Sequence, residues 1–188
     1  MYQIIKQILR TGNKTETPPQ PDDALRVEVQ QLNADILRHL GRALAIRHVD
    51  AGSCNGCELE IHALNNAYYN IEGLGIQFVA SPRHADLLLV TGPVSRHMEI
   101  ALKRTYDATP EPKLVVAVGD CGCTGGIFSP DCSPDNLPGG GGESYASCGK
   151  ISNVIPVDVA VPGCPPTPTA LLQAILTAIA GSAKTAAS

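Results

Sequence analysis

The stretch KLVVAVGDCGC, residues 113–123, is an unbroken apolar run followed by a glycine, an aspartate and two cysteines. A strand with one face in water alternates apolar and polar residues, whereas a strand covered on both faces is apolar throughout. The run at 114–118 therefore predicts a central strand of a parallel sheet. DLLLVTG, residues 86–92, has the same character and predicts a second such strand.

Further strands and helices alternate on both sides of these runs. The expected strands cover residues 43–50, 76–81, 86–92, 113–120 and 153–161, and the expected helices cover residues 58–71, 95–108 and 167–181. Regular alternation of strand and helix is typical of parallel sheets with crossover helices. The sequence therefore predicts a doubly wound, flavodoxin-like α/β fold with helices on both faces of the sheet.

The chain divides by composition into three parts. They are an N-terminal arm and linker at 1–23, a single α/β domain at 24–183 and a tail at 184–188. The arm combines a short amphipathic helix with a polar, proline-containing linker, and the domain opens with an amphipathic helix at about 24–40. Inside the domain, residues 129–147 are rich in glycine, proline and serine, which predicts a surface loop.

Composition excludes several classes of protein. Lys and Arg total 14 against 18 Asp and Glu, a net charge of −4, so the basic surface of a nucleic-acid-binding protein is missing. The N-terminal residues lack the continuous apolar core of a secretory signal, and the most apolar helix, at 169–181, is too short to cross a bilayer. We therefore expect a cytoplasmic protein that does not bind nucleic acid.

Seven cysteines are many for a cytoplasmic chain, because disulfides do not persist in a reducing compartment. Metal binding or redox chemistry explains them better. Five of the seven follow predicted strands, namely Cys54, Cys57, Cys121, Cys123 and Cys164. The carboxyl ends of parallel strands share one edge, where such folds bind ligands. These thiols are therefore expected to meet at that edge.

Four thiolates at this edge would suit either a [4Fe-4S] cluster or a zinc ion, because both are bound by four sulfur ligands. The set would contain Cys54, Cys57, Cys164 and one of Cys121 and Cys123. Structural zinc sites usually contain two C-x-x-C pairs, whereas two of the ligands here come singly from remote loops. A redox-active dithiol at Cys54 and Cys57 would leave the other thiols unexplained.

Four further side chains near these motifs are interpreted more weakly. Cys132 and Cys148 lie in the loop region without a preceding strand and are interpreted as buried, unreactive residues. Glu58 and Glu60 open a predicted helix, where carboxylates ordinarily compensate the helix dipole. Because they follow Cys57 closely, one of them is also a candidate proton relay. We find no nucleophile elbow and no phosphate-binding loop, so no catalytic residue is expected on this chain.

Four ordered motifs together carry a family resemblance. They are CNGCELEI at 54–61, ASPRHADLLLVTGPVS at 80–95, GDCGCTGGIF at 119–128 and IPVDVAVPGCPPTPTALL at 155–172. They resemble the small, cluster-bearing subunit of membrane-bound, energy-converting [NiFe] hydrogenases and formate hydrogenlyases. That subunit shares a superfamily with the 20 kDa, B-type subunit of respiratory complex I. The resemblance extends from about His48 to about Ala180, and C-x-x-C in place of two adjacent cysteines favours the hydrogenase branch.

The resemblance implies one [4Fe-4S] cluster bound by Cys54, Cys57, Cys121 and Cys164, with Cys123 at a non-ligand position. It implies electron transfer to or from a [NiFe] large subunit, with a ferredoxin-like cluster subunit as a further partner. Membrane subunits would attach the chain indirectly to the cytoplasmic face of the inner membrane. The alternatives are a complex I-like protein that passes electrons to quinone beside a quinone-site subunit, or a zinc-binding structural or regulatory domain.

Overall fold

The computed structural model describes residues 2–11, 42–129 and 145–185. At the N-terminus it has the expected short helix, α1 (Tyr2–Thr11). Several predictions lie outside the described residues, namely the linker, the helix at 24–40 and most of the glycine-rich loop with Cys132.

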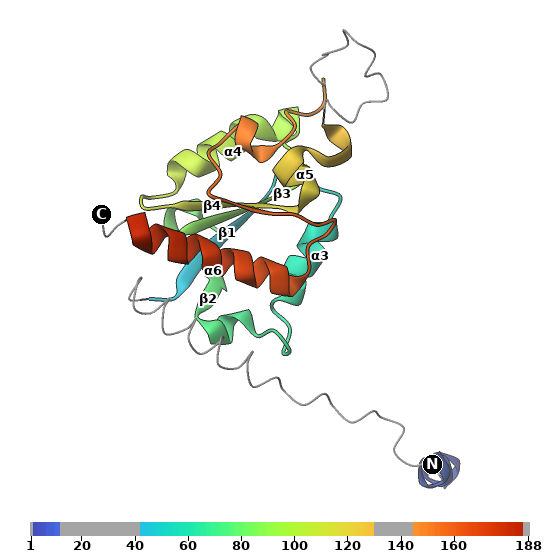
Figure 1. Ribbon diagram of the computed structural model, residues 1–188. Helices are drawn as coiled ribbons and strands as arrows, with labels where there is room; N and C mark the ends of the chain where they lie inside the picture. Colours follow the sequence, from blue (N-terminus) through green and yellow to red (C-terminus); the bar gives the residue numbers. More distant parts are fainter. Residues whose placement is uncertain (1, 12–41, 130–144, 186–188) are drawn as a thin grey trace.

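Five parallel strands form the centre of the domain (Figure 1). They are β1 (Leu44–Asp50), β2 (Ile76–Phe78), β3 (Leu87–Thr91), β4 (Leu114–Val118) and β5 (Val159–Val161). Their order across the sheet is β2-β1-β3-β4-β5, and every neighbouring pair is parallel. This is the flavodoxin-like strand order, so the predicted fold class is confirmed.

Helices cover both faces of this sheet (Figure 1). They are α3 (Gly56–Ala63), α4 (Arg96–Ala108), α5 (Gly119–Thr124) and α6 (Pro168–Thr185), with 3₁₀ turns η1 (Ile71–Leu74), η2 (Pro82–His84), η3 (Gly126–Phe128) and η5 (Ile151–Asn153). Helix α6 packs against β4, β5 and α3 on one face, and α4 packs on the other. Helix α4 begins at the cap Ser95, whose side chain accepts a hydrogen bond from the N–H of Met98.

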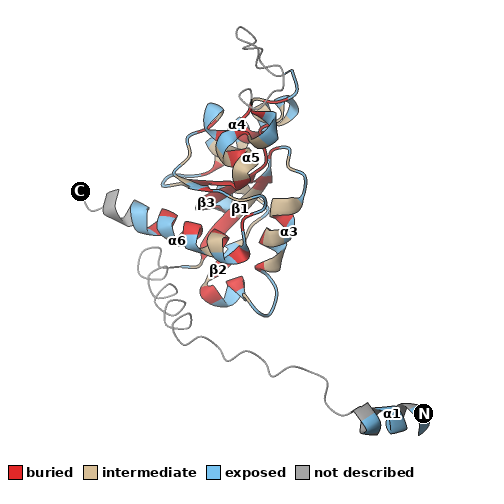
Figure 2. Ribbon diagram, turned by 45° about the vertical axis from the view of Figure 1, so that its right-hand side comes forward, coloured by how far each residue is buried: buried red, intermediate tan, exposed pale blue. Residues whose placement is uncertain are grey.

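Two aliphatic cores explain why the central strands are apolar at every position. Leu89 packs in one core with Ile175 of α6, whereas its neighbour Leu88 packs in the other with Leu102 of α4. All four side chains are fully buried. Figure 2 shows these strands as a buried layer between half-buried and exposed helices. Successive side chains of a strand point to opposite faces, so a strand covered on both faces needs an apolar residue at each step.

Two aspartates join neighbouring strands at the amino edge of the sheet, each through a reciprocal pair of hydrogen bonds. The N–H of Asp86 donates to the carbonyl of Ala45 (2.8 Å), and its carboxylate accepts from the N–H of Ala45 (3.0 Å). The N–H of Asp158 donates to the carbonyl of Val115 (2.9 Å), and its carboxylate accepts from the N–H of Val115 (2.7 Å). We call this arrangement an aspartate clasp.

Two predicted elements were too long. The helix expected at 58–71 ends at Ala63, because the side-chain oxygen of Asn66 accepts hydrogen bonds from the N–H groups of Tyr68 and Tyr69 and stabilises a turn. The strand expected at 153–161 is formed only from Val159. Pro156 lies in the missing part, and proline has no N–H for a ladder.

Two further differences concern helices. The helix expected at 167–181 continues to Thr185. Helix α5 was not predicted, since GDCGCT contains no apolar pattern of helical period.

Candidate metal centre

Three segments at the carboxyl edge of the sheet carry the predicted ligands. The first (residues 51–57) follows β1, the second (residues 119–126) follows β4, and the third (residues 162–167) follows β5. In Figure 1 the start of α3, helix α5 and the start of α6 gather at the same end of the sheet.

The structure brings Cys54, Cys57, Cys121 and Cys164 together. Burial, the neighbouring Glu58 and the other three thiols raise the pKa of Cys57 to about 12. Burial also raises the pKa of Cys121, with contributions from Cys164 and Cys54. Such mutual effects require short separations, because interactions between charges weaken with distance. In the described part of the chain all four thiols are free; Cys57 and Cys121 are half-buried, and Cys54 and Cys164 are exposed.

Cys123 lies apart from this group. Its Sγ donates to the carbonyl of Ala117 (3.6 Å), and it packs against the core on the α4 side of the sheet. Burial raises its pKa, and the other groups that act on it are the Val161 backbone and Asp120 rather than the four thiols. Of the two cysteines in the second segment, Cys121 is therefore the one that faces the other thiols.

The first segment is fixed by Asp50, the last residue of β1. Its Oδ1 accepts hydrogen bonds from the N–H groups of Gly52 and Ser53, both at 2.8 Å. The N–H of Ala51 donates to the carbonyl of Thr91 at the end of β3 (3.0 Å). These bonds orient the chain before it reaches the C-x-x-C pair.

Gly119 is the point where all three segments meet. Its φ is +81°, a left-handed conformation that favours glycine. A Cβ at this position would lie 2.7 Å from Sγ of Cys57 and 3.4 Å from the carbonyl oxygen of Gly163. The second segment can therefore approach the first and the third this closely only because residue 119 has no side chain.

The donor set fits a [4Fe-4S] cluster in number and chemistry, since four thiolates are the ligands that such clusters use. Within the described ranges, no group of three or more Cys, His, Asp or Glu side chains is arranged to hold a single metal ion. A cluster does not require convergence on one point, because each of its irons binds a different thiolate. The four converging thiols satisfy that looser requirement.

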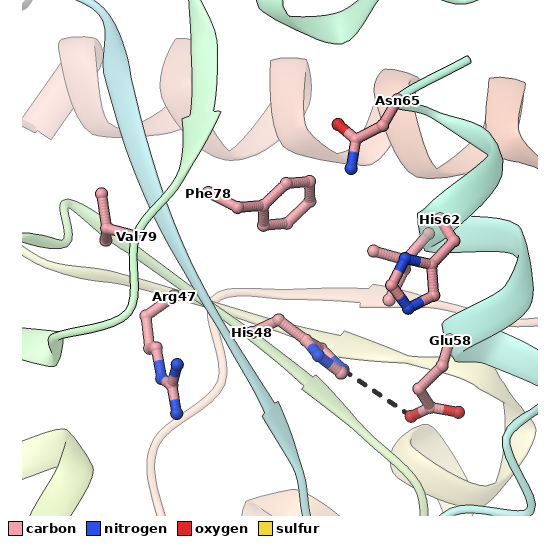
Figure 3. Close-up of a pocket in the computed structure, with 8 residues that line it drawn as sticks. Arg47, His48, Glu58, His62, Asn65, Phe78 and Val79 are labelled. Carbon is pink, nitrogen blue, oxygen red and sulfur yellow. Dashed lines mark ion pairs between the residues drawn. The ribbon is translucent and has the colours of Figure 1, made fainter.

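A pocket of about 220 Å³ lies beside this group, at the edge of β1 beyond the end of β2 (Figure 3). Its lining combines polar and apolar side chains, namely Arg47, His48, Glu58, Ile61, His62, Asn65, Phe78 and Val79. Of the two glutamates singled out in the sequence, only Glu58 lines it. His48 was missed, although its position near the end of a strand and before a cysteine segment was a usable signal.

Glu58 is buried without a hydrogen-bond partner among the described residues. Its side chain is 8% exposed, and both carboxylate oxygens lack such a partner there. His48 Nε2 lies 3.6 Å from Oε1 and 3.1 Å from Oγ1 of Thr91, and Figure 3 shows His48 and Glu58 pointing toward one another. Burial lowers the pKa of His48 despite the opposing effect of Glu58, so the imidazole is neutral at pH 7. Glu60 is half-buried.

Cys148 belongs to a different part of the molecule. It is half-buried rather than buried, and its Sγ lies 3.4 Å from Oε2 of Glu99 on α4, which also pairs with Lys103. The thiol packs against the core on the α4 side. It is remote from the four thiols in the contacts it makes.

Large apolar side chains are exposed beside the four thiols. Leu59, two residues after Cys57, is 62% exposed, and Ile127 and Phe128, which follow the second segment, are 79% and 53% exposed. Exposed apolar groups next to a ligand-binding edge are typical of surfaces that another protein covers.

Comparison with known families gives a direct match. The family described as NADH ubiquinone oxidoreductase, 20 kDa subunit, matches residues 54–178. A probable membrane-bound hydrogenase subunit, mbhJ, of Pyrococcus furiosus is 40% identical over 159 residues, which covers 85% of this chain and 87% of that protein.

Further relatives come from two kinds of complex. Formate hydrogenlyase subunit 7 of Escherichia coli is 36% identical and covers 90% of this chain and 60% of its own length. The B-type subunit of NADH-quinone oxidoreductase from Desulfovibrio desulfuricans is 37% identical, covering 90% and 88%.

Two solved structures are similar in fold. A chain of the archaeal membrane-bound sulfane sulfur reductase aligns with a TM-score of 0.59 and 31% identity, covering 78% of this chain and 72% of that chain. A chain of an NAD⁺-reducing [NiFe]-hydrogenase aligns with a TM-score of 0.52 and 21% identity, covering 72% and 92%.

Proposed function

Because this chain belongs to the family of the 20 kDa subunit of NADH ubiquinone oxidoreductase, we propose that it is the electron-transfer subunit of a multi-subunit, membrane-associated hydrogenase. It is an oxidoreductase subunit, like its relatives. In this proposal it carries one [4Fe-4S] cluster next to a [NiFe] catalytic subunit. The observation that supports the proposal most directly is the convergence of four free thiols from three segments.

We assign the cluster ligands to Cys54, Cys57, Cys121 and Cys164. A bound cluster would supply one-electron transfer, which needs no base or nucleophile from the protein. The chain contributes the positions of the thiols: Asp50 orients the first segment, and Gly119 lets the second approach it. The half-buried Cys57 and Cys121 lie on the protein side, while the exposed Cys54 and Cys164 leave the outer side open to an electron-transfer partner.

A protein partner on that outer side is supported by the exposed Leu59, Ile127 and Phe128. None of the helices in the described ranges has the length and hydrophobicity needed to cross a membrane, whereas the name of the Pyrococcus relative places that protein in a membrane-bound hydrogenase. We propose that other subunits attach the chain to the cytoplasmic face of the inner membrane. A ferredoxin-like cluster subunit would be the next electron carrier.

A second candidate is a complex I-like role, in which the chain passes electrons to quinone. It is favoured by the 37% identity to a B-type subunit of NADH-quinone oxidoreductase over 90% of this chain. The C-x-x-C spacing of Cys54 and Cys57 favours the hydrogenase. The two proposals share the cluster and differ in the partner.

The function is tested on the chain purified anaerobically with its natural partners from membranes. We expect about four irons and four sulfides per chain, little zinc, and a low-temperature EPR signal after reduction with dithionite. Nickel in the co-purified large subunit and reduction of the cluster by H₂ would identify the hydrogenase, whereas oxidation by a quinone without nickel would identify the alternative. Zinc without iron would contradict both.

We also propose Glu58 as the proton-relay candidate, because it is buried beside the neutral His48 and directly follows Cys57. In the assembled complex, Glu58→Gln should lower proton-coupled turnover by about tenfold or more and change its pH profile. Glu60→Gln, further along the helix and outside the pocket lining, is the matched control and should leave both unchanged. Equal behaviour of the two variants would remove Glu58 from this role.

A further inference from the structure

Asp120 joins the second and third cysteine segments. Its N–H donates to the carbonyl of Gly163 (2.9 Å), and its Oδ1 accepts from the N–H of Gly163 (2.7 Å). Asp120 directly precedes Cys121, and Gly163 directly precedes Cys164. The two hydrogen bonds therefore connect the residues that lie immediately before two of the proposed ligands.

This is the same aspartate clasp that Asp86 and Asp158 form at the amino edge of the sheet. There each clasp joins two neighbouring strands, β1 with β3 or β4 with β5. At the carboxyl edge the third clasp joins two segments that have already left β4 and β5. What the third clasp fixes is therefore the separation of two thiols.

The electrostatics of the second segment make this placement costly. The carboxylate of Asp120 is one of the groups that raise the pKa of Cys121, so it opposes the thiolate form that binds iron. A carboxylate beside a ligand is therefore unfavourable unless it contributes in another way. The clasp provides that contribution, because it supplies two hydrogen bonds between segments that lie beyond the ends of the β4–β5 ladder.

The third segment has little freedom to replace the clasp by another contact. Gly163 has φ +136°, and a Cβ there would lie 2.6 Å from Cα of Pro166. Its carbonyl oxygen also faces Gly119, at 3.4 Å from a Cβ placed on that residue. The backbone of Gly163 thus lies between the second segment and a proline, and its N–H is directed to Asp120.

We propose that Asp120 is a positioning residue that sets the distance between Cys121 and Cys164 for cluster binding. This inference rests on the proposed function, since it assumes that these two thiols are cluster ligands. Without the clasp, the third segment depends on its attachment to β5 and α6, and the cluster site is less well organised before iron binds. Loss of such supporting contacts typically costs 10–100-fold in metal affinity.

The test compares three variants of the full chain. Asp120→Ala removes the clasp and the charge, whereas Asp120→Asn removes the charge and keeps an acceptor oxygen. Asp158→Ala is the matched control, because it breaks a clasp with the same hydrogen-bond lengths, 2.9 and 2.7 Å, at the opposite edge of the sheet. Two measurements are made: amide hydrogen exchange of Gly163 by NMR in the iron-free chain, and iron release to a chelator after anaerobic reconstitution.

We expect Asp120→Ala to lose protection of the Gly163 amide and to release iron about 10–100-fold faster than the unmodified chain. Asp120→Asn should retain that protection and release iron within about threefold of the unmodified rate. Asp158→Ala should lower thermal stability without accelerating iron release.

The proposal is overturned if Asp120→Ala releases iron at the unmodified rate, or if Asp158→Ala releases it equally fast, which would indicate a general loss of stability. If the unmodified chain binds no iron, the proposed function fails instead. The exchange of the Gly163 amide would then still report whether the clasp forms.

Discussion

A Cys121→Ser chain is expected to lose nearly all of its cluster iron, while a Cys123→Ser chain keeps it. The reason is the direction of the two side chains. Cys121 interacts with Cys54, Cys57 and Cys164. Cys123 instead donates to a strand carbonyl and packs against a core. A serine hydroxyl stays protonated at neutral pH and does not replace a thiolate as an iron ligand.

Both variants should be purified anaerobically in the assembled complex, with iron and sulfide measured per chain and EPR recorded after reduction. Cys148→Ser is the control for a half-buried thiol outside the site. Iron loss in Cys123→Ser with retention in Cys121→Ser would exchange the two assignments. Equal iron loss in all three variants would mean that the thiols act through folding and would contradict the ligand set.

Gly119→Ala is expected to have the next strongest effect, combining lower stability with loss of the cluster. A left-handed conformation costs a non-glycine residue about 1–2 kcal/mol. In addition, the new Cβ would lie 2.7 Å from Sγ of Cys57, so either Cys57 or the second segment must move. The thermal midpoint and the iron content of the purified chain measure the two parts of this effect.

Gly149→Ala separates the two causes. Gly149 has φ +78°, close to the +81° of Gly119, but among the described residues a Cβ there would contact only the side-chain nitrogen of Asn153, at 3.2 Å. This variant should therefore lose similar stability and retain its iron. If Gly119→Ala retains iron as well as Gly149→Ala does, close packing at residue 119 is not needed for the cluster.

The fold was predictable because its strongest signals are local. Continuous apolar runs such as 114–118 are typical of strands covered on both faces, and the structure buries them between two cores. Element ends were less predictable because they depend on single contacts. The turn at Asn66 ends α3 early through side-chain hydrogen bonds to its own backbone, which no periodicity reveals.

The pocket beside the thiols was not predictable from the sequence. Glu58 follows a cysteine and was noticed for that reason, but its burial depends on His48 at the end of β1. Which strand end lies beside which helix start depends on the strand order. The aspartate clasps are similar, since Asp120 and Gly163 become neighbours only when β4 and β5 pair.

The meeting of the cysteines follows from the order of residues alone, because they come after strands whose apolar character requires a parallel sheet, and parallel strands end at one edge. The choice between Cys121 and Cys123 required the folded chain. These residues lie in the short helix α5, where each residue turns the chain by about 100°. Two residues apart, the thiols point about 200° away from each other, so one faces the other cysteines and the other faces the core.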